Sequence, residues 1–149
     1  MILFFDTSAL VRRYHITEPG ALSVRRLCHR SNSNELVIFS ITSVEVASAF
    51  NRKVQEGRIE AAQRDRMWRL FLAHQRSQYT VVTFSNQIMR RAQRLLFRHR
   101  LRAYDAMQLA AALELARSLP RGAEFRFCTA DRPQTRAAEE EGLAVEFIT

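Results

Sequence analysis

Short apolar runs typical of β-strands alternate with segments of helical periodicity along the whole chain. The strand-like runs are Ile2–Phe5, Leu36–Phe39, Tyr79–Val82, Phe125–Cys128 and Ala144–Ile148. The segments with apolar residues at helical spacing are Thr7–Tyr14, Pro19–Arg30, Thr42–Glu56, Ile59–Gln75, Ser85–Arg98, Ala103–Ser118 and Pro133–Glu141. Strands joined by helices form parallel sheets that helices cover on both faces. The alternation therefore predicts an α/β fold with a central parallel sheet.

The length of the chain suits one domain. Its 149 residues can bury a core of their own, and no repeat or Pro/Gly/Ser-rich linker divides them, so we expect residues 1–149 to form a single domain. The apolar runs are far shorter than a membrane span, and MILFFDTSAL lacks the basic and long apolar regions of a secretory signal. Cys28 and Cys128 stand alone, as reduced thiols do. We expect a cytoplasmic protein that is not bound to a membrane.

Four acidic residues stand in apolar settings far apart in the chain. Asp6 directly follows the first strand-like run, and Asp131 lies just beyond the fourth, so both are predicted at the sheet edge where ligands collect. Glu45 and Asp105 lie among small apolar residues of helical segments. Carboxylates brought together in such settings repel one another and cost free energy unless a cation compensates them. Oxygen-only ligands favour Mg²⁺ or Mn²⁺, so the pattern predicts a metal site.

Each of the four acids also has an ordinary structural alternative. Asp6 and Asp131 can each cap the helix that follows, although the hydroxyl residues after Asp6 can serve as caps in its place. Glu45 can be a solvated helix residue, and the helix dipole can stabilise Asp105 in a first turn. The alternative is strongest for Asp131, because its local sequence fits a capping residue well.

The charge balance suits a polyanionic substrate. The chain carries 23 basic and 15 acidic residues, for a net charge of +8, and a metal-bound acidic centre within such a basic body matches nucleic acid. Arg12, Arg13 and Arg102 lie close in sequence to the acids and are candidates for contacts with a phosphate backbone; simple solvation is the alternative. Genomic base composition explains the preference for arginine equally well, since only Lys53 is a lysine.

Other catalytic patterns are missing from the chain. No H-x-x-x-H spacing, P-loop or G-x-G-x-x-G occurs, and no serine stands in a nucleophile elbow. The four histidines neighbour arginines or polar residues, so we expect them at the surface or at its rim. The acidic residues therefore carry the chemistry that this sequence predicts.

Four stretches of the chain resemble the PIN-domain family, and especially its VapC-type toxins of toxin–antitoxin pairs. They are FFDTSALVRRYHITEPGA, ITSVEVASAFNRKVQEGRI, LRAYDAMQLAAALELA and FRFCTADRPQTRAAEEEGLAV. The resemblance implies a three-layer α/β/α sandwich with a five-stranded parallel sheet of order 3-2-1-4-5. It also implies a Mg²⁺- or Mn²⁺-dependent ribonuclease that is usually a homodimer. The residues that fall on the family's acidic quartet and supporting hydroxyl positions are Asp6, Glu45, Asp105, Asp131, Ser8 and Thr129.

The expected function is hydrolysis of RNA phosphodiester bonds by a toxin that a cognate antitoxin protein neutralises. Two alternatives stay open: a PIN-fold module that binds RNA or a partner without cutting, and a nuclease that acts on DNA or in RNA processing. The apolar segment RMWRLFLAHQ is predicted equally well as part of a partner interface and as part of the core.

Overall fold

The computed structural model describes residues 1–149 and contains one five-stranded parallel sheet. Its strands are β1 (Ile2–Phe5), β2 (Glu35–Phe39), β3 (Tyr79–Val82), β4 (Phe125–Thr129) and β5 (Val145–Phe147). Their order in the sheet is β3-β2-β1-β4-β5, and all four neighbouring pairs are parallel. The predicted α/β class and strand order are therefore confirmed.

Seven α-helices connect the strands. They are α1 (Thr7–Leu10), α2 (Ala21–Leu27), α3 (Thr42–Gln55), α4 (Ala61–Ser77), α5 (Asn86–Arg98), α6 (Ala103–Ser118) and α7 (Arg132–Glu140). The first two predicted helical segments are longer than the helices found. The first continues from α1 into a tighter 3₁₀ turn at Val11–Arg13, whereas α2 ends at Leu27 and a separate 3₁₀ turn follows at Arg30–Asn32. None of these helices has the length and apolar character that crossing a membrane requires.

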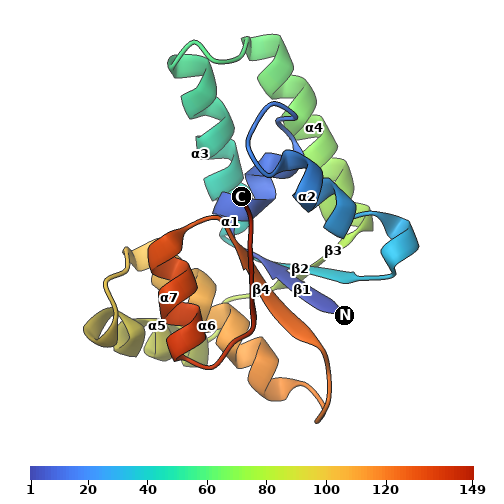
Figure 1. Ribbon diagram of the computed structural model, residues 1–149. Helices are drawn as coiled ribbons and strands as arrows, with labels where there is room; N and C mark the ends of the chain where they lie inside the picture. Colours follow the sequence, from blue (N-terminus) through green and yellow to red (C-terminus); the bar gives the residue numbers. More distant parts are fainter.

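The sheet separates two apolar layers. Side chains alternate along a strand, so Leu3 and Phe5 join a cluster with α1, α2, α3 and α4, whereas Phe4 joins a cluster with α5, α6 and α7. Figure 1 shows these two groups of helices on opposite sides of the sheet, with the pair α3 and α4 projecting beyond it. Every residue of the central strand from Leu3 to Phe5 is fully buried.

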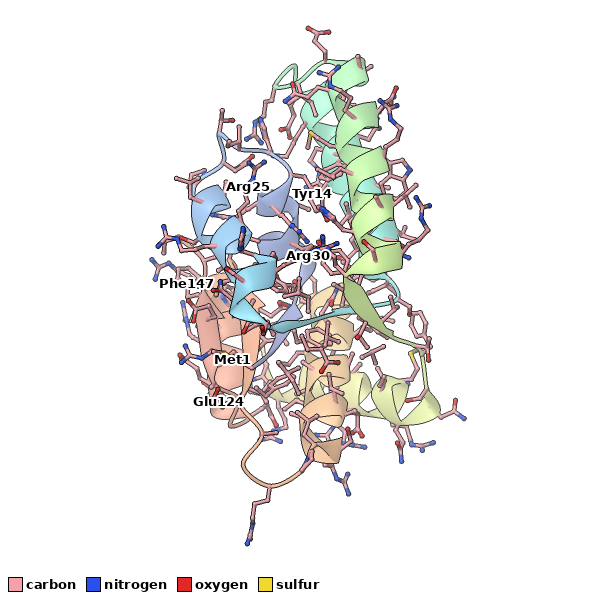
Figure 2. The ribbon with its side chains drawn as sticks, turned by 90° about the vertical axis from the view of Figure 1, so that its right-hand side faces the viewer. Met1, Tyr14, Arg25, Arg30, Glu124 and Phe147 are labelled. Carbon is pink, nitrogen blue, oxygen red and sulfur yellow. The ribbon has the colours of Figure 1, made fainter.

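The strands run in one direction, so the two edges of the sheet differ. At the amino edge, the Ile2 amide donates to the carbonyl of Glu124 (2.8 Å), and Figure 2 shows Met1 and Glu124 side by side there. At the carboxyl edge, the chain leaves β1 for α1, β2 for α3 and β4 for α7. The strand order reverses direction between β1 and β4, which makes this edge a topological switch point.

The chain's last residues pack against the start of α2 at Gly20. This glycine has a φ of +80°, and a Cβ added to it would lie 2.5 Å from Cγ2 of Ile148 and 3.0 Å from the carbonyl oxygen of Thr149. Gly57 also has a positive φ, +70°, but a Cβ added there would meet no atom within 4 Å. An alanine at Gly57 would therefore meet backbone strain alone, whereas an alanine at Gly20 would meet the strain and a steric clash.

We expect Gly20→Ala to lower the free energy of unfolding by about 2–4 kcal/mol, because it adds overpacking to left-handed strain. Gly57→Ala should cost only about 1–2 kcal/mol, since it carries the strain alone. Urea unfolding of both variants at one pH provides the comparison. Equal losses in the two variants would show that the contact at Gly20 relaxes without cost.

Candidate metal centre

Asp6 ends the central strand and begins α1. Its Oδ1 accepts a hydrogen bond from the amide of Ala9 (2.9 Å), so Asp6 itself caps the helix. The hydroxyl of Ser8 donates to the same carboxylate (2.8 Å), and the hydroxyl of Thr129 donates to Oδ2 (2.6 Å). The expectation that a hydroxyl residue replaces Asp6 as the cap is therefore wrong. The hydroxyl of Ser8 orients the carboxylate, and that of Thr7 turns toward Glu45.

Burial makes the charge of Asp6 expensive. The residue is only 3% exposed, and desolvation raises its pKa to about 7. Hydrogen bonds from Thr129, Ala9 and Ser8 lower the pKa, and the negative charge of Asp105 raises it further. Without a cation, this carboxyl group is therefore only partly ionised at neutral pH.

Hydroxyl groups join the ends of β1 and β4. Thr129, which is fully buried, donates to Asp6 and accepts a hydrogen bond from the amide of Asp131 (3.1 Å). Ser8 accepts a hydrogen bond from the amide of Ala130 (2.9 Å). The two acids at the strand ends thus share one hydrogen-bond network, and its geometry does not depend on long flexible side chains.

Asp131 caps α7, as its structural alternative predicted. Its Oδ1 accepts from the amide of Gln134 (2.9 Å), and Pro133 lies in the first turn. Its Oδ2 accepts no hydrogen bond and forms no ion pair. Capping and a role at the carboxyl edge are therefore compatible, because the cap occupies one oxygen and leaves the other free.

Glu45 lies in the first turn of α3 and is partly buried. Its Oε1 accepts hydrogen bonds from the hydroxyl of Thr7 (2.9 Å) and from Nε2 of Gln108 (2.8 Å). Gln108 is 1% exposed, and its amide also lies 2.9 Å from the hydroxyl of Thr42. The sequence reasoning missed Gln108; the signal was a lone amide within the small apolar residues of DAMQLAAAL.

Asp105 lies in the first turn of α6, partly buried and without a hydrogen bond to its carboxylate. Burial raises its pKa, and so do the negative charges of Asp131 and Glu45, while Arg102 lowers it. The one ion pair that it makes is with Nε of Arg102 at 3.6 Å, and that arginine side chain is 88% exposed. The charge of Asp105 is thus weakly compensated, although it lies near other acids.

The four acids share one local position: each caps a helix or lies in its first turn. Asp6, Glu45, Asp105 and Asp131 stand at the starts of α1, α3, α6 and α7. Helix amino termini carry partial positive charge, which stabilises carboxylates there. The charges that raise the pKa values of Asp6 and Asp105 come from other members of this set. The structure therefore brings the four predicted residues to one edge of the sheet.

The carboxylates are near one another but do not form a closed ligand shell. No group of three or more His, Cys, Asp or Glu side chains lies close enough together to hold a metal ion. The chemistry of the donors nevertheless fits a hard cation. All are oxygens, the carboxylates of Asp105 and Asp131 keep free oxygen atoms, and the only cationic partner is the exposed Arg102.

Two of the three arginine candidates for phosphate contacts, Arg12 and Arg13, bond other groups of the protein. Arg13 donates to the hydroxyl of Tyr79 (2.6 Å) and to Oε1 of Gln78 (2.7 Å), and Arg12 donates to the carbonyl of Pro19 (2.5 Å). These two guanidinium groups are engaged within the protein, so the structure favours only Arg102 as a residue beside the acids.

The prediction that the histidines lie at the surface or at its rim is wrong for His15. His15 is buried, and the ring of His99 is 7% exposed and paired with Glu140 and Glu141. His74 is partly buried, and its Nδ1 lies 3.0 Å from the hydroxyl oxygen of Tyr14. Only His29 is exposed. Cys28 and Cys128 are buried and form no disulfide.

Comparisons with known proteins agree on the fold. A family model described as PIN domain matches residues 3–140. The chain is similar to VapBC2 from Rickettsia felis, solved bound to a DNA fragment from their promoter, with a TM-score of 0.67, 14% identity, and coverage of 99% of this chain and 98% of that one. The chain is also similar to PAE2754 from Pyrobaculum aerophilum, with a TM-score of 0.62, 20% identity, and coverage of 97% of this chain and 83% of that one.

A third structure, VapBC-1 from nontypeable Haemophilus influenzae, gives a TM-score of 0.60 at 16% identity, with coverage of 99% of this chain and 98% of that one. At such identities the similarity shows the fold alone. No curated protein matches the chain.

The raised pKa of Asp6 predicts how stability depends on pH when no metal is present. The unfolded chain releases this proton near pH 3.8, whereas the folded protein holds it up to a pKa of about 7. Stability should therefore fall as the pH rises from about 4 to about 7. Asp6→Asn removes this penalty, so in EDTA at pH 8 the variant should exceed the wild type by about 1–4 kcal/mol.

Urea unfolding at pH 5 and pH 8 measures this difference, and Asp65→Asn is a matched control because Asp65 is exposed on α4. The control should leave the pH dependence unchanged. A clear loss of stability in Asp6→Asn at pH 8 would contradict the account of a buried, strained anion.

Proposed function

The chain belongs to the PIN-domain family, and on this basis we propose that it is a metal-dependent endoribonuclease, the toxin of a VapBC-type toxin–antitoxin pair. The observation that carries the proposal is the meeting of four helix-start carboxylates, with one exposed arginine as their only cationic partner. Natural folds rarely keep so many weakly compensated anions together unless a cation or a reaction uses them. The reaction class is hydrolysis of a phosphodiester bond.

We assign the binding of Mg²⁺ or Mn²⁺ to Asp6, Glu45, Asp105 and Asp131. When bound there, the ion supplies an activated water and offsets charge on the phosphate. Asp105 and Asp131 have carboxylate oxygens that no protein group occupies, so they are the most available ligands. Asp6 is fixed in orientation, and its affinity for a cation should rise as its proton is lost near pH 7.

Hydroxyl and amide groups act as positioning residues for these carboxylates. Ser8 and Thr129 hold Asp6, while Thr7 and Gln108 hold one oxygen of Glu45 and leave Oε2 without a hydrogen bond. A carboxylate with one oxygen fixed presents the other in a defined direction. The predicted roles of Ser8 and Thr129 therefore rest on their contacts with Asp6.

The proposed substrate is RNA. The net charge of +8 attracts a polyanion, and Arg102 lies beside Asp105 where a phosphate would approach. A metal-bound phosphate is alike in RNA and DNA, so a nuclease that acts on DNA or in RNA processing is the enzymatic alternative. Protection of the substrate by 2′-deoxy substitution separates the two polymers.

The proposed partners are a cognate antitoxin and a second copy of this chain. A cleft of about 240 Å³ between α3 and α4 is lined by Phe50, Asn51, Arg64 and Trp68 among others, and it can hold a partner's side chains. In the segment RMWRLFLAHQ, Phe71 is buried in the core and Trp68 lines this cleft, so the segment contributes to both. We place the pair in the cytoplasm, where free thiols such as Cys28 and Cys128 stay reduced.

A non-catalytic PIN module is the second candidate. The observation in its favour is that the acids do not close into a three-ligand group in this structure. Such a module would bind RNA or a protein with the same basic surface and leave every phosphodiester bond intact. Cleavage therefore decides between the two.

Purified protein should cleave a pool of single-stranded RNA in Mn²⁺, and EDTA should abolish the reaction. Asp105→Asn removes a carboxylate with free oxygens and should lower the initial rate at least about a hundredfold. Asp65→Asn, which removes an exposed acid on α4, should keep the wild-type rate. The fraction of intact RNA on a denaturing gel is the measurement.

A rate in Asp105→Asn equal to that of the wild type would contradict the catalytic assignment. RNA that stays intact with every protein preparation would favour the binding module instead.

A further inference from the structure

A cleft opens beside the acidic residues, between the start of α7 and the connection from α5 to α6. Its volume is about 440 Å³, which is within the range of small-ligand sites. The residues that line it are Leu96, His99, Arg100, Leu101, Arg102, Asp105, Asp131 and Pro133. Two of the proposed metal ligands thus form one wall, and a basic and apolar segment forms the other.

Contacts with α7 hold the basic wall in place. Nε2 of His99 lies 2.7 Å from Oε1 of Glu141, and its Nδ1 lies 3.2 Å from Oε2 of Glu140. Arg98 adds an ion pair with Glu141 at 3.3 Å. The far end of α7 therefore anchors the segment after α5, while the cap of the same helix is Asp131. One helix fixes both walls of the cleft.

Arg100 has no partner within the protein. It is exposed, lines the cleft, and forms no hydrogen bond or ion pair, in contrast to Arg91 and Arg98 of α5, which pair with glutamates. Arg102, the other guanidinium of the cleft, makes only a long contact of 3.6 Å with Asp105. Free guanidinium groups in a cleft are suited to bidentate recognition of a phosphate.

The negative charge of the acidic site explains why cationic side chains beside it would help to bind a substrate. Four ionised carboxylates with one divalent cation would keep two negative charges, which would repel the phosphates on either side of the reacting one. Two arginines in the adjoining cleft offset that remainder. The apolar side chains of Leu96, Leu101 and Pro133 in the same cleft provide a surface for a ribose or a base.

We propose that this cleft binds the nucleotide next to the scissile phosphate of single-stranded RNA, with Arg100 contacting its non-reacting phosphate. The proposal rests on the function proposed above and adds a subsite to it. Arg100 is the residue specific to this subsite, and His99 is a positioning residue that keeps Arg100 in reach through its contacts with α7.

The test measures RNA binding without cleavage. Fluorescence anisotropy with labelled single-stranded RNA of random sequence, in the Asp6→Asn background, reports the Kd across a range of salt concentrations. Arg100→Ala should weaken binding about tenfold and should lower the slope of log Kd against log salt by about 0.7, the share of one phosphate contact on a single strand.

The matched control is Arg121→Ala. Arg121 is also exposed, but it precedes Glu124 in the connection to β4 and so lies toward the amino edge of the sheet, where Figure 2 shows Glu124. This variant loses the same charge; it should change Kd by less than about twofold and should leave the salt slope unchanged, because it removes no phosphate contact. Equal effects of Arg100→Ala and Arg121→Ala would overturn the subsite, because they would show that Arg100 contributes to RNA binding only through the net charge of the protein.

Cleavage assays in the otherwise wild-type chain keep the two proposals apart. Arg100→Ala should raise KM with little change in kcat, and Arg100→Lys should restore part of the loss. Unchanged KM beside normal cleavage would reject the subsite and leave the nuclease function intact. Arg100-dependent RNA binding by a wild-type protein that cuts nothing would support the subsite and reject the nuclease function.

Discussion

The rest of the site depends on the hydrogen bonds that hold the buried carboxylate of Asp6 at the end of β1. An ionised group that is 3% exposed is tolerated because the amide of Ala9 and the hydroxyls of Ser8 and Thr129 converge on it. The same hydroxyl of Thr129 accepts from the amide of Asp131, so the first and fourth strands reach the site in fixed relation. Even so, burial holds the pKa near 7, and a cation must compete with a proton for this oxygen. The fold fixes the position of the Asp6 carboxylate, and the pH and the cation concentration determine whether it is ionised.

Helix geometry explains how four acids can meet without unfolding the protein. Each stands where a helix begins, and the partial positive charge of that terminus reduces the repulsion without removing it. The charge changes sign within a short distance, from Asp105 and Asp131 on one wall of the adjoining cleft to Arg100 and Arg102 on the other. A strand of nucleic acid can lie across such a gradient with its reacting phosphate toward the acids and its next phosphate toward the arginines. The proposed chemistry and the proposed subsite therefore follow from one distribution of charge.

Much of this arrangement could be predicted from the sequence, and the failures have physical causes. Alternating apolar runs predicted the parallel sheet, and the positions of Asp6 and Asp131 after strand-like runs placed both at the carboxyl edge without reference to any family. Glu45 and Asp105 were predicted from their apolar helical settings together with the family resemblance, because a first-turn acid is common in helices and its direction depends on tertiary packing. Gln108 and His99 were missed for a related reason: the residues they bond lie 63 and 42 positions away in the chain, so no local pattern marks them.

Calorimetric titration of Mn²⁺ tests the central claim, that these carboxylates form one cation site, most directly. The wild-type protein should bind Mn²⁺ saturably, with an affinity that increases between pH 6 and pH 8 as Asp6 loses its proton. Asp105→Asn should weaken this binding at least about tenfold, since it removes a ligand with free oxygens. Equal heats of binding for the wild type and Asp105→Asn, or an affinity that does not change with pH, would contradict the claim.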